Sequence, residues 1–178
     1  MPNYRRVYAR GHSYFLTIVT HNRQPILVKN IDFLRTVFAE SKSIYTYDIH
    51  AIVILPDHLH MIIEPQNSDE YPKIVSYLKR KFTYLLHQSG KYTDIHSISP
   101  SKVAKRESNI WQRRYYEHTI RNEKDFNLHM DYIHYNPVKH QYVDAAYQWK
   151  HSSFHKYLKL DWYTKEWCNF SNDYSLGE

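Results

Sequence analysis

Cysteine is nearly absent from this sequence, since Cys168 is the only one in 178 residues. One thiol cannot form an intramolecular disulfide, and it cannot build the multi-thiolate sites that hold structural zinc. Long apolar runs are missing too, because no stretch approaches the length of a transmembrane helix. The first six residues lack the apolar core of a signal peptide. We therefore expect a protein of the reducing cytoplasm that does not enter a membrane.

The overall composition is that of a folded, basic and aromatic-rich chain. A length of 178 residues and a hydrophobic content of 42% indicate one domain with a proper core. The formal net charge of +6 favours a polyanionic partner. The 18 tyrosines, interleaved with lysine and arginine, would suit single-stranded nucleic acid, which binds through base stacking and phosphate contacts. Alternatively, many of these tyrosines simply pack with their hydroxyls at the surface.

Hydrophobic periodicity predicts strand, helix, strand, strand, helix and strand, in that order. The expected strands are 12–20, 48–55, 58–64 and 110–120, and the expected helices are 30–45 and 68–89. This order is typical of the ferredoxin-like (split βαβ) fold of the α+β class, an antiparallel sheet with two helices on one face. We expect a single domain over 1–157, a polar loop over 91–109 within it, and a C-terminal tail over 158–178.

Two histidines mark the third predicted strand. His58 and His60 are two residues apart, so a strand directs both imidazoles to one face and Leu59 and Met61 to the other. The two helices require apolar side chains beneath them, so we expect the histidines on the opposite face. Two adjacent neutral imidazoles form half of a divalent-metal site. With 13 histidines in the chain, the alternative is a pair of half-exposed strand residues without a metal.

A further helix is predicted to begin at Asn122. Its polar stripe holds a phenol and three groups able to bind a metal or carry a proton: Asp125, His129, Tyr132 and Asn136. Pro137 predicts that the helix ends at about Asn136. The alternative for Tyr132 is a structural tyrosine packed at the sheet edge.

Four short motifs follow one another between roughly residues 3 and 155. They are Tyr4-Arg5-Arg6, Leu55-Pro56-Asp57-His58-Leu59-His60, Trp111-Gln112 leading into Glu117-His118-Thr119-Ile120-Arg121-Asn122, and Asp131-Tyr132-Ile133-His134-Tyr135-Asn136-Pro137-Val138-Lys139-His140. Together they resemble the REP-associated tyrosine transposases, bacterial relatives of the single-tyrosine transposases in the His-hydrophobic-His nuclease superfamily. Two departures stand out: Gln141 occupies a position where the family often has glycine, and the 91–109 loop is longer than we would expect.

The resemblance implies a site and a reaction. It implies a divalent metal on His58 and His60, with Asn136 as third ligand, and Tyr132 as the nucleophile, Tyr135 being the nearest rival. Mg²⁺ or Mn²⁺ suits this imidazole-plus-oxygen set, although the ligands alone do not exclude zinc. The implied enzyme cleaves and rejoins single-stranded DNA carrying REP-type palindromic hairpins, through a 5′-phosphotyrosine intermediate. We expect a monomer, although related transposases work as dimers.

Basic side chains are the candidates for contacts with the DNA backbone. They are Arg5, Arg6, Lys79, Arg80, Lys81, Arg113, Arg114, Arg121 and Lys139. Two other functions compete with the transposase hypothesis. One is a non-catalytic single-stranded nucleic-acid-binding protein that stacks bases on its sheet. The other is a metal-dependent hydrolase in which Tyr132 is structural.

Overall fold

The computed structural model describes residues 12–90 and 109–167. Its strands are β1 (Tyr14–Val19), β2 (Tyr47–Ile54), β3 (His58–Pro65) and β4 (Tyr116–Thr119). Its α-helices are α1 (Ile31–Ile44), α2 (Tyr71–Gln88), α4 (Glu123–Lys139) and α5 (Phe154–Lys159). Short 3-10 turns lie at His21–Arg23, Val28–Asn30, Ser68–Glu70 and Ala146–Gln148. In this part of the chain no helix is long and apolar enough to cross a bilayer.

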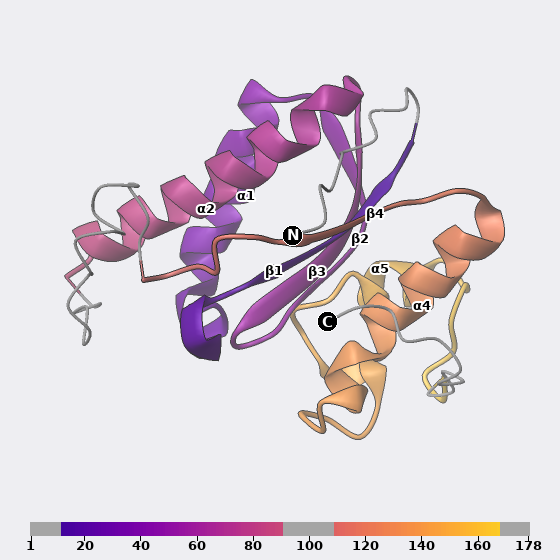
Figure 1. Cartoon of the computed structure of the whole chain (residues 1–178). Coiled ribbons are helices and arrows are strands. Elements are labelled where there is room, and N and C mark those ends of the chain that lie inside the picture. Colours follow the sequence, from indigo (N-terminus) through magenta and orange to yellow (C-terminus); the bar gives the residue numbers. More distant parts are fainter. Residues whose placement is uncertain (1–11, 91–108, 168–178) are drawn as a thin grey trace.

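The strands form one antiparallel sheet in the order β2-β3-β1-β4. Helices α1 and α2 cover one face, whereas α4 and α5 lie on the other side (Figure 1). This arrangement confirms the predicted α+β class, with its antiparallel sheet, two helices on one face and a tyrosine-bearing helix on the other. The strand order is that of the split βαβ pattern.

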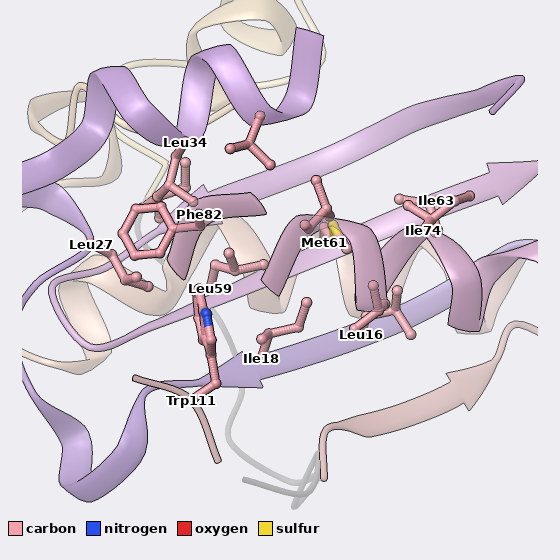
Figure 2. Packing of buried hydrophobic residues seen from close by; sticks show 14 of the residues in the cluster. Leu16, Ile18, Leu27, Leu34, Leu59, Met61, Ile63, Ile74, Phe82 and Trp111 are labelled. Carbon is pink, nitrogen blue, oxygen red and sulfur yellow. The ribbon is translucent and has the colours of Figure 1, made fainter. Parts of the chain in front are cut away.

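Alternation along the strands divides the core into two clusters. Leu59, Met61 and Ile63 of β3 pack with Leu16 and Ile18 of β1 beneath α1 and α2 (Figure 2). The residues between them, such as Ile62, pack on the other face against α4 and the C-terminal segment. Both faces of the two central strands are therefore buried, and a side chain on either face needs a partner inside the protein.

Residues 151–153 protect β2, which is an edge strand. The Ile54 amide donates to the His151 carbonyl at 2.9 Å, and the Ser153 amide donates to the Ile52 carbonyl at 2.8 Å. The last residues of this edge, Ile52 to Ile54, are therefore paired and not open to another strand. The apolar run in β2 thus belongs to an edge that a distant segment covers.

The predicted strand 110–120 is shorter than expected. Only Tyr116–Thr119 pair regularly with β1, while Trp111 forms one isolated bridge to Thr20. The Lys79 ammonium donates to the carbonyls of Gln112 and Arg113, at 2.7 and 3.3 Å. These carbonyls turn toward α2, so the segment between the bridge and β4 leaves the sheet.

The prediction that α4 ends at Asn136 is wrong. The helix continues through Pro137 to Lys139, and the His140 amide donates to the Asn136 carbonyl at 3.0 Å. Proline lacks an amide hydrogen, so its position loses one helical hydrogen bond. Pro137 lies in the buried part of the helix, together with Asn136.

Part of the predicted tail packs on the domain. Tyr163 lies in the cluster beneath α4, its hydroxyl donates to Asp131 Oδ1 at 2.6 Å, and Trp167 packs against its ring. The division into a domain over 1–157 and a tail over 158–178 stays a prediction. Of the predicted loop 91–109, residues 91–108 lie outside the described residues.

His134 joins α4 to residues 151–153, the segment that pairs with the edge of β2. Its Nε2 lies 2.8 Å from the Ser153 hydroxyl, which in turn donates to the Ile52 carbonyl. Burial lowers the pKa of His134 to about 3, so the imidazole stays neutral in the folded protein.

We therefore expect His134 to make stability depend on pH. Below pH 6.5 the unfolded imidazole binds a proton that the folded one does not, so the free energy of unfolding falls as the pH drops toward 3. The contribution is at most about 1.4 kcal/mol per pH unit. Urea unfolding of wild type and His134→Gln between pH 7 and 4 measures the difference in slope. His87→Gln, at an exposed position, is the control, and equal slopes for wild type and His134→Gln would contradict the assignment.

Candidate active site

The two histidines of β3 face α4, as predicted. His58 is 2% exposed and His60 is 0% exposed, so both are core residues despite their polarity. Their ring centres are 4.9 Å apart. The half-exposed alternative is wrong, and a buried pair of this kind needs a chemical reason to be there.

Each histidine is held by its Nδ1 atom. His58 Nδ1 lies 2.6 Å from Asp57 Oδ1, and His60 Nδ1 lies 2.8 Å from the hydroxyl of Thr17, its neighbour in register on β1. Within the described residues, both Nε2 atoms are buried without a hydrogen-bond partner. An imidazole fixed through one nitrogen and open at the other is the usual preparation of a metal ligand.

The local electrostatics keep these groups in the forms that metal binding requires. Burial, together with the positive charges of neighbours such as Lys139 and Arg23, holds the pKa of His60 well below 6.5. Burial acts to raise the pKa of Asp57, but the hydrogen bond to His58 and the nearby Arg23 outweigh it and lower that pKa. His60 is therefore neutral and Asp57 is ionised at neutral pH.

Helix α4 presents a row of side chains to the histidine pair. The Tyr132 ring centre is 5.2 Å from that of His60, and the His140 ring centre is 5.0 Å from that of His58. Asn136 lies one turn from each along the helix and is fully buried. Among the described residues its amide oxygen and nitrogen have no hydrogen-bond partner. Along the chain it lies midway between Tyr132 and His140, the two residues whose rings contact the histidines.

These residues fit a divalent cation. Two imidazole Nε2 atoms and one amide oxygen are buried without hydrogen-bond partners in residues 12–90 and 109–167, and Mg²⁺ and Mn²⁺ accept an amide oxygen as ligand. A buried polar atom without a partner costs about 1–3 kcal/mol, so the same atoms would be a liability in a purely structural core.

A second group of metal-binding residue types lies near the start of α4. Ligand atoms of His118, Asp125 and His129 lie within 4.8 Å of one another. His129 Nδ1, however, is 2.8 Å from the Asp125 backbone carbonyl, which can only accept, so that nitrogen carries a proton. His118 Nε2 contacts Asp125 Oδ2 at 2.8 Å. We interpret this group as a hydrogen-bonded clamp between β4 and α4.

The two candidate tyrosines of α4 face different surroundings. Tyr132 packs against His60 and against Phe15, whose ring centre is 5.9 Å away. Tyr135 packs beside Trp167, at 6.5 Å, toward the C-terminal segment. The polar stripe predicted from the sequence therefore brings Tyr132, and not Tyr135, to the histidine pair.

The predicted DNA-contacting residues are spread over the molecule. Arg5 and Arg6 lie outside the described residues. On α2, across the sheet from Tyr132, Lys79 donates to backbone carbonyls and Lys81 pairs with Glu40 at 3.0 Å. Four arginines of the predicted set are exposed: Arg80, Arg113, Arg114 and Arg121. Lys139 is the member of this set that contacts the proposed nucleophile, since its Nζ atom lies 3.4 Å from the Tyr132 hydroxyl oxygen.

Comparisons with known proteins give the family. A family model for IS200-like transposases matches residues 8–136, which include the histidine pair, Tyr132 and Asn136. The chain is 40% identical over 169 residues to a Haemophilus influenzae protein named as a REP-associated tyrosine transposase, covering 94% of this chain and 93% of that protein. The chain belongs to the REP-associated tyrosine transposases. It is an enzyme of the class that cleaves and rejoins DNA.

Two further relatives agree with this assignment. A REP-associated tyrosine transposase of Escherichia coli K12 is 34% identical to this transposase over 180 residues, covering 100% of this chain and 98% of that protein. A solved structure of a REP-associated tyrosine transposase bound to a REP hairpin has a TM-score of 0.81 and 33% identity. That likeness covers 100% of this chain and 98% of that chain.

The alternative of a non-catalytic binding protein does not agree with the structure of this transposase. Bases would have to stack on an open sheet face, but α4 and the C-terminal segment cover the face that α1 and α2 leave free (Figure 1). Tyr115, one of the aromatics considered for stacking, packs instead against the cluster beneath α1 and α2.

Sequence reasoning missed three residues of this site. His140 continues the polar stripe at 15 residues from Asp125, but a helix that ends at Asn136, as the sequence predicts from Pro137, does not reach it. Thr17 and Asp57 hold the histidines at Nδ1. Asp57 was visible as a neighbour of His58, but nothing local marks Thr17, 43 residues from His60.

We expect Thr17→Val to weaken metal binding without unfolding the protein. Valine matches threonine in shape and suits a strand, but it cannot hold His60 Nδ1. Loss of such a partner costs about 10- to 100-fold in metal affinity. Titration calorimetry with Mn²⁺ measures the change. Thr36→Val on the exposed side of α1 is the control, and equal Mn²⁺ affinity in all three proteins would refute the role of Thr17.

Proposed function

We propose that this transposase cleaves and rejoins single-stranded DNA that carries REP-type palindromic hairpins, with Tyr132 as nucleophile and a 5′-phosphotyrosine intermediate. The observation that carries the proposal is the placement of the Tyr132 ring 5.2 Å from His60, beside two buried imidazole Nε2 atoms that have no partner among the described residues. A relative of known structure binds a REP hairpin, which supports the substrate class.

The chemistry is phosphoryl transfer by a tyrosine. The Tyr132 oxygen attacks the scissile phosphorus, the bond from phosphorus to the 3′ oxygen breaks, and the 3′ oxygen leaves as a hydroxyl. The 5′ phosphate remains on Tyr132 as a diester, which retains the energy of the broken bond. Another 3′ hydroxyl can then attack the same phosphorus and release the tyrosine, so strand transfer needs no external energy source.

The metal ligands of this proposal are His58, His60 and Asn136, with Mg²⁺ or Mn²⁺ as the ion. When bound, such an ion supplies Lewis-acid stabilisation of charge on the phosphate oxygens. The chain's own residues position this chemistry, because Asp57 and Thr17 fix the imidazoles and α4 fixes the tyrosine. His129 is the alternative third ligand, since its Nδ1 donates to the Asp125 carbonyl and its Nε2 then carries the lone pair that a metal requires.

Contacts with the DNA backbone complete the proposal. We assign them to Arg5, Arg6, Lys79, Arg80, Lys81, Arg113, Arg114, Arg121 and Lys139, which would make affinity strongly dependent on salt. The site of action is the cytoplasm, where the bacterial chromosome is accessible.

Tyr132→Phe tests the nucleophile. It deletes one oxygen, so folding and DNA affinity should persist, while cleavage and the DNA-linked protein band on a denaturing gel should both disappear. Tyr135→Phe, one turn along the same helix, is the matched control and should form the adduct normally. Persistence of the adduct in Tyr132→Phe would remove this tyrosine as nucleophile. Cleavage with a free 5′ phosphate and no adduct in wild type would indicate a hydrolase.

We also propose that the active unit is a monomer. His58→Ala and Tyr132→Phe should each be inactive, and a mixture of the two should remain inactive because each chain needs both groups. Gel assays of single-stranded cleavage on the mixture measure this. Recovered cleavage would mean that α4 of one chain serves the histidines of another, and the monomer proposal would be wrong.

A further inference from the structure

Lys139 lies against the proposed nucleophile. It is the last residue of α4, two helical turns after Tyr132, so both side chains leave the helix on the same side. Its Nζ atom is 3.4 Å from the Tyr132 hydroxyl oxygen and 5.0 Å from the centre of the ring. The ammonium therefore lies toward the oxygen end of the phenol.

Other lysines of the fold have different kinds of contact. Lys73 and Lys81 pair with the carboxylates of Asp69 and Glu40, and Lys79 donates to backbone carbonyls. Those contacts join neighbouring turns or segments. Lys139 instead donates to the Tyr132 hydroxyl oxygen, the atom that bonds to phosphorus in the proposed reaction. An ammonium can only donate, so the phenol oxygen is the acceptor.

We propose that Lys139 is a catalytic residue, whose ammonium stabilises the negative charge that develops on the Tyr132 oxygen during strand transfer. This inference rests on the proposed function. During cleavage, the Tyr132 hydroxyl loses its proton to water as its oxygen bonds to phosphorus, and the departing 3′ oxygen takes a proton from water. During rejoining, the attacking 3′ hydroxyl loses its proton to water as it bonds to phosphorus, while the Tyr132 oxygen leaves with the electron pair of its bond and takes a proton from water. Lys139 stays protonated in both steps.

The physical basis is a charge that is in place before the reaction begins. A cation already held near an oxygen that gains negative charge in the transition state stabilises that state more than the ground state. A lysine that only contacts the DNA backbone stabilises both states equally, and it then affects binding and not the rate of the chemical step. Measuring the Kd for DNA and the rate of adduct formation separately therefore distinguishes a catalytic Lys139 from one that only contacts the DNA backbone.

The test is a set of single-turnover rates at saturating hairpin DNA. We expect Lys139→Met to slow formation of the covalent adduct by about 10- to 100-fold, with the Kd for DNA changed by less than about threefold. Lys139→Arg, which retains the charge, should recover most of the rate. Lys139→Gln gives a second neutral variant, and its thermal melting confirms folding. Lys124→Met, at an exposed lysine in the first turn of α4, is the control.

A sulfur substitution in the DNA locates the action of Lys139. A bridging sulfur at the 3′ position leaves readily without a proton, so it would rescue a variant that lacks an acid for the leaving group. We expect no rescue of Lys139→Met, because we place Lys139 at the tyrosine oxygen. The rejoining rate, measured by adding a 3′-hydroxyl oligonucleotide to the isolated adduct, should also fall by about 10-fold or more.

Three results would overturn the inference. They are an unchanged rate in Lys139→Met, a loss confined to DNA affinity, or rescue by the bridging sulfur. None of them affects the proposed function, which depends on whether Tyr132→Phe abolishes the adduct. A Tyr132→Phe protein that still forms the adduct would instead remove the proposed function, and the role of Lys139 with it.

Discussion

Burial of both faces of β3 is the constraint on which this structure depends. Leu59, Met61 and Ile63 complete the core beneath α1 and α2, so the alternate residues of the strand enter the core on the other side. Two of those alternate residues are histidines, His58 and His60. An imidazole in a core must either satisfy both nitrogens within the protein or keep one for another partner. Here Asp57, in the turn before β3, and Thr17 of β1 hold the Nδ1 atoms, and both Nε2 atoms are buried without a hydrogen-bond partner among the described residues.

Helix α4 lies against the histidine pair, and residues eight apart along the chain contact the two histidines of β3. Tyr132 meets His60, His140 meets His58, and Asn136 lies between them at one-turn spacing. One helix therefore carries both the proposed nucleophile, Tyr132, and the proposed oxygen ligand, Asn136, so their separation does not depend on loop conformation. The clamp of His118, Asp125 and His129 joins the start of the same helix to β4.

The C-terminal segment holds α4 from the outside. His134 bonds Ser153, which bonds Ile52 of the edge strand, so one hydrogen-bonded chain joins the helix to the sheet. The Tyr163 hydroxyl adds a hydrogen bond to Asp131 of the same helix. Pro137 removes one hydrogen bond from α4. The contacts of His134 and Tyr163 hold the same helix against the rest of the protein.

The sequence by itself determined the features that depend on local periodicity. Alternation placed His58 and His60 on one face, and helical spacing placed Asp125, His129, Tyr132 and Asn136 on one stripe, because both repeats are properties of a single element. The tertiary structure alone decided how these elements meet. Thr17 reaches His60 only through strand pairing, and Lys79 of α2 donates to the Gln112 and Arg113 carbonyls in the segment where a longer strand was predicted. Pro137 lies in a buried part of α4, the helix continues to Lys139, and the His140 ring then meets that of His58. Such contacts join segments far apart in the chain, so no local pattern records them.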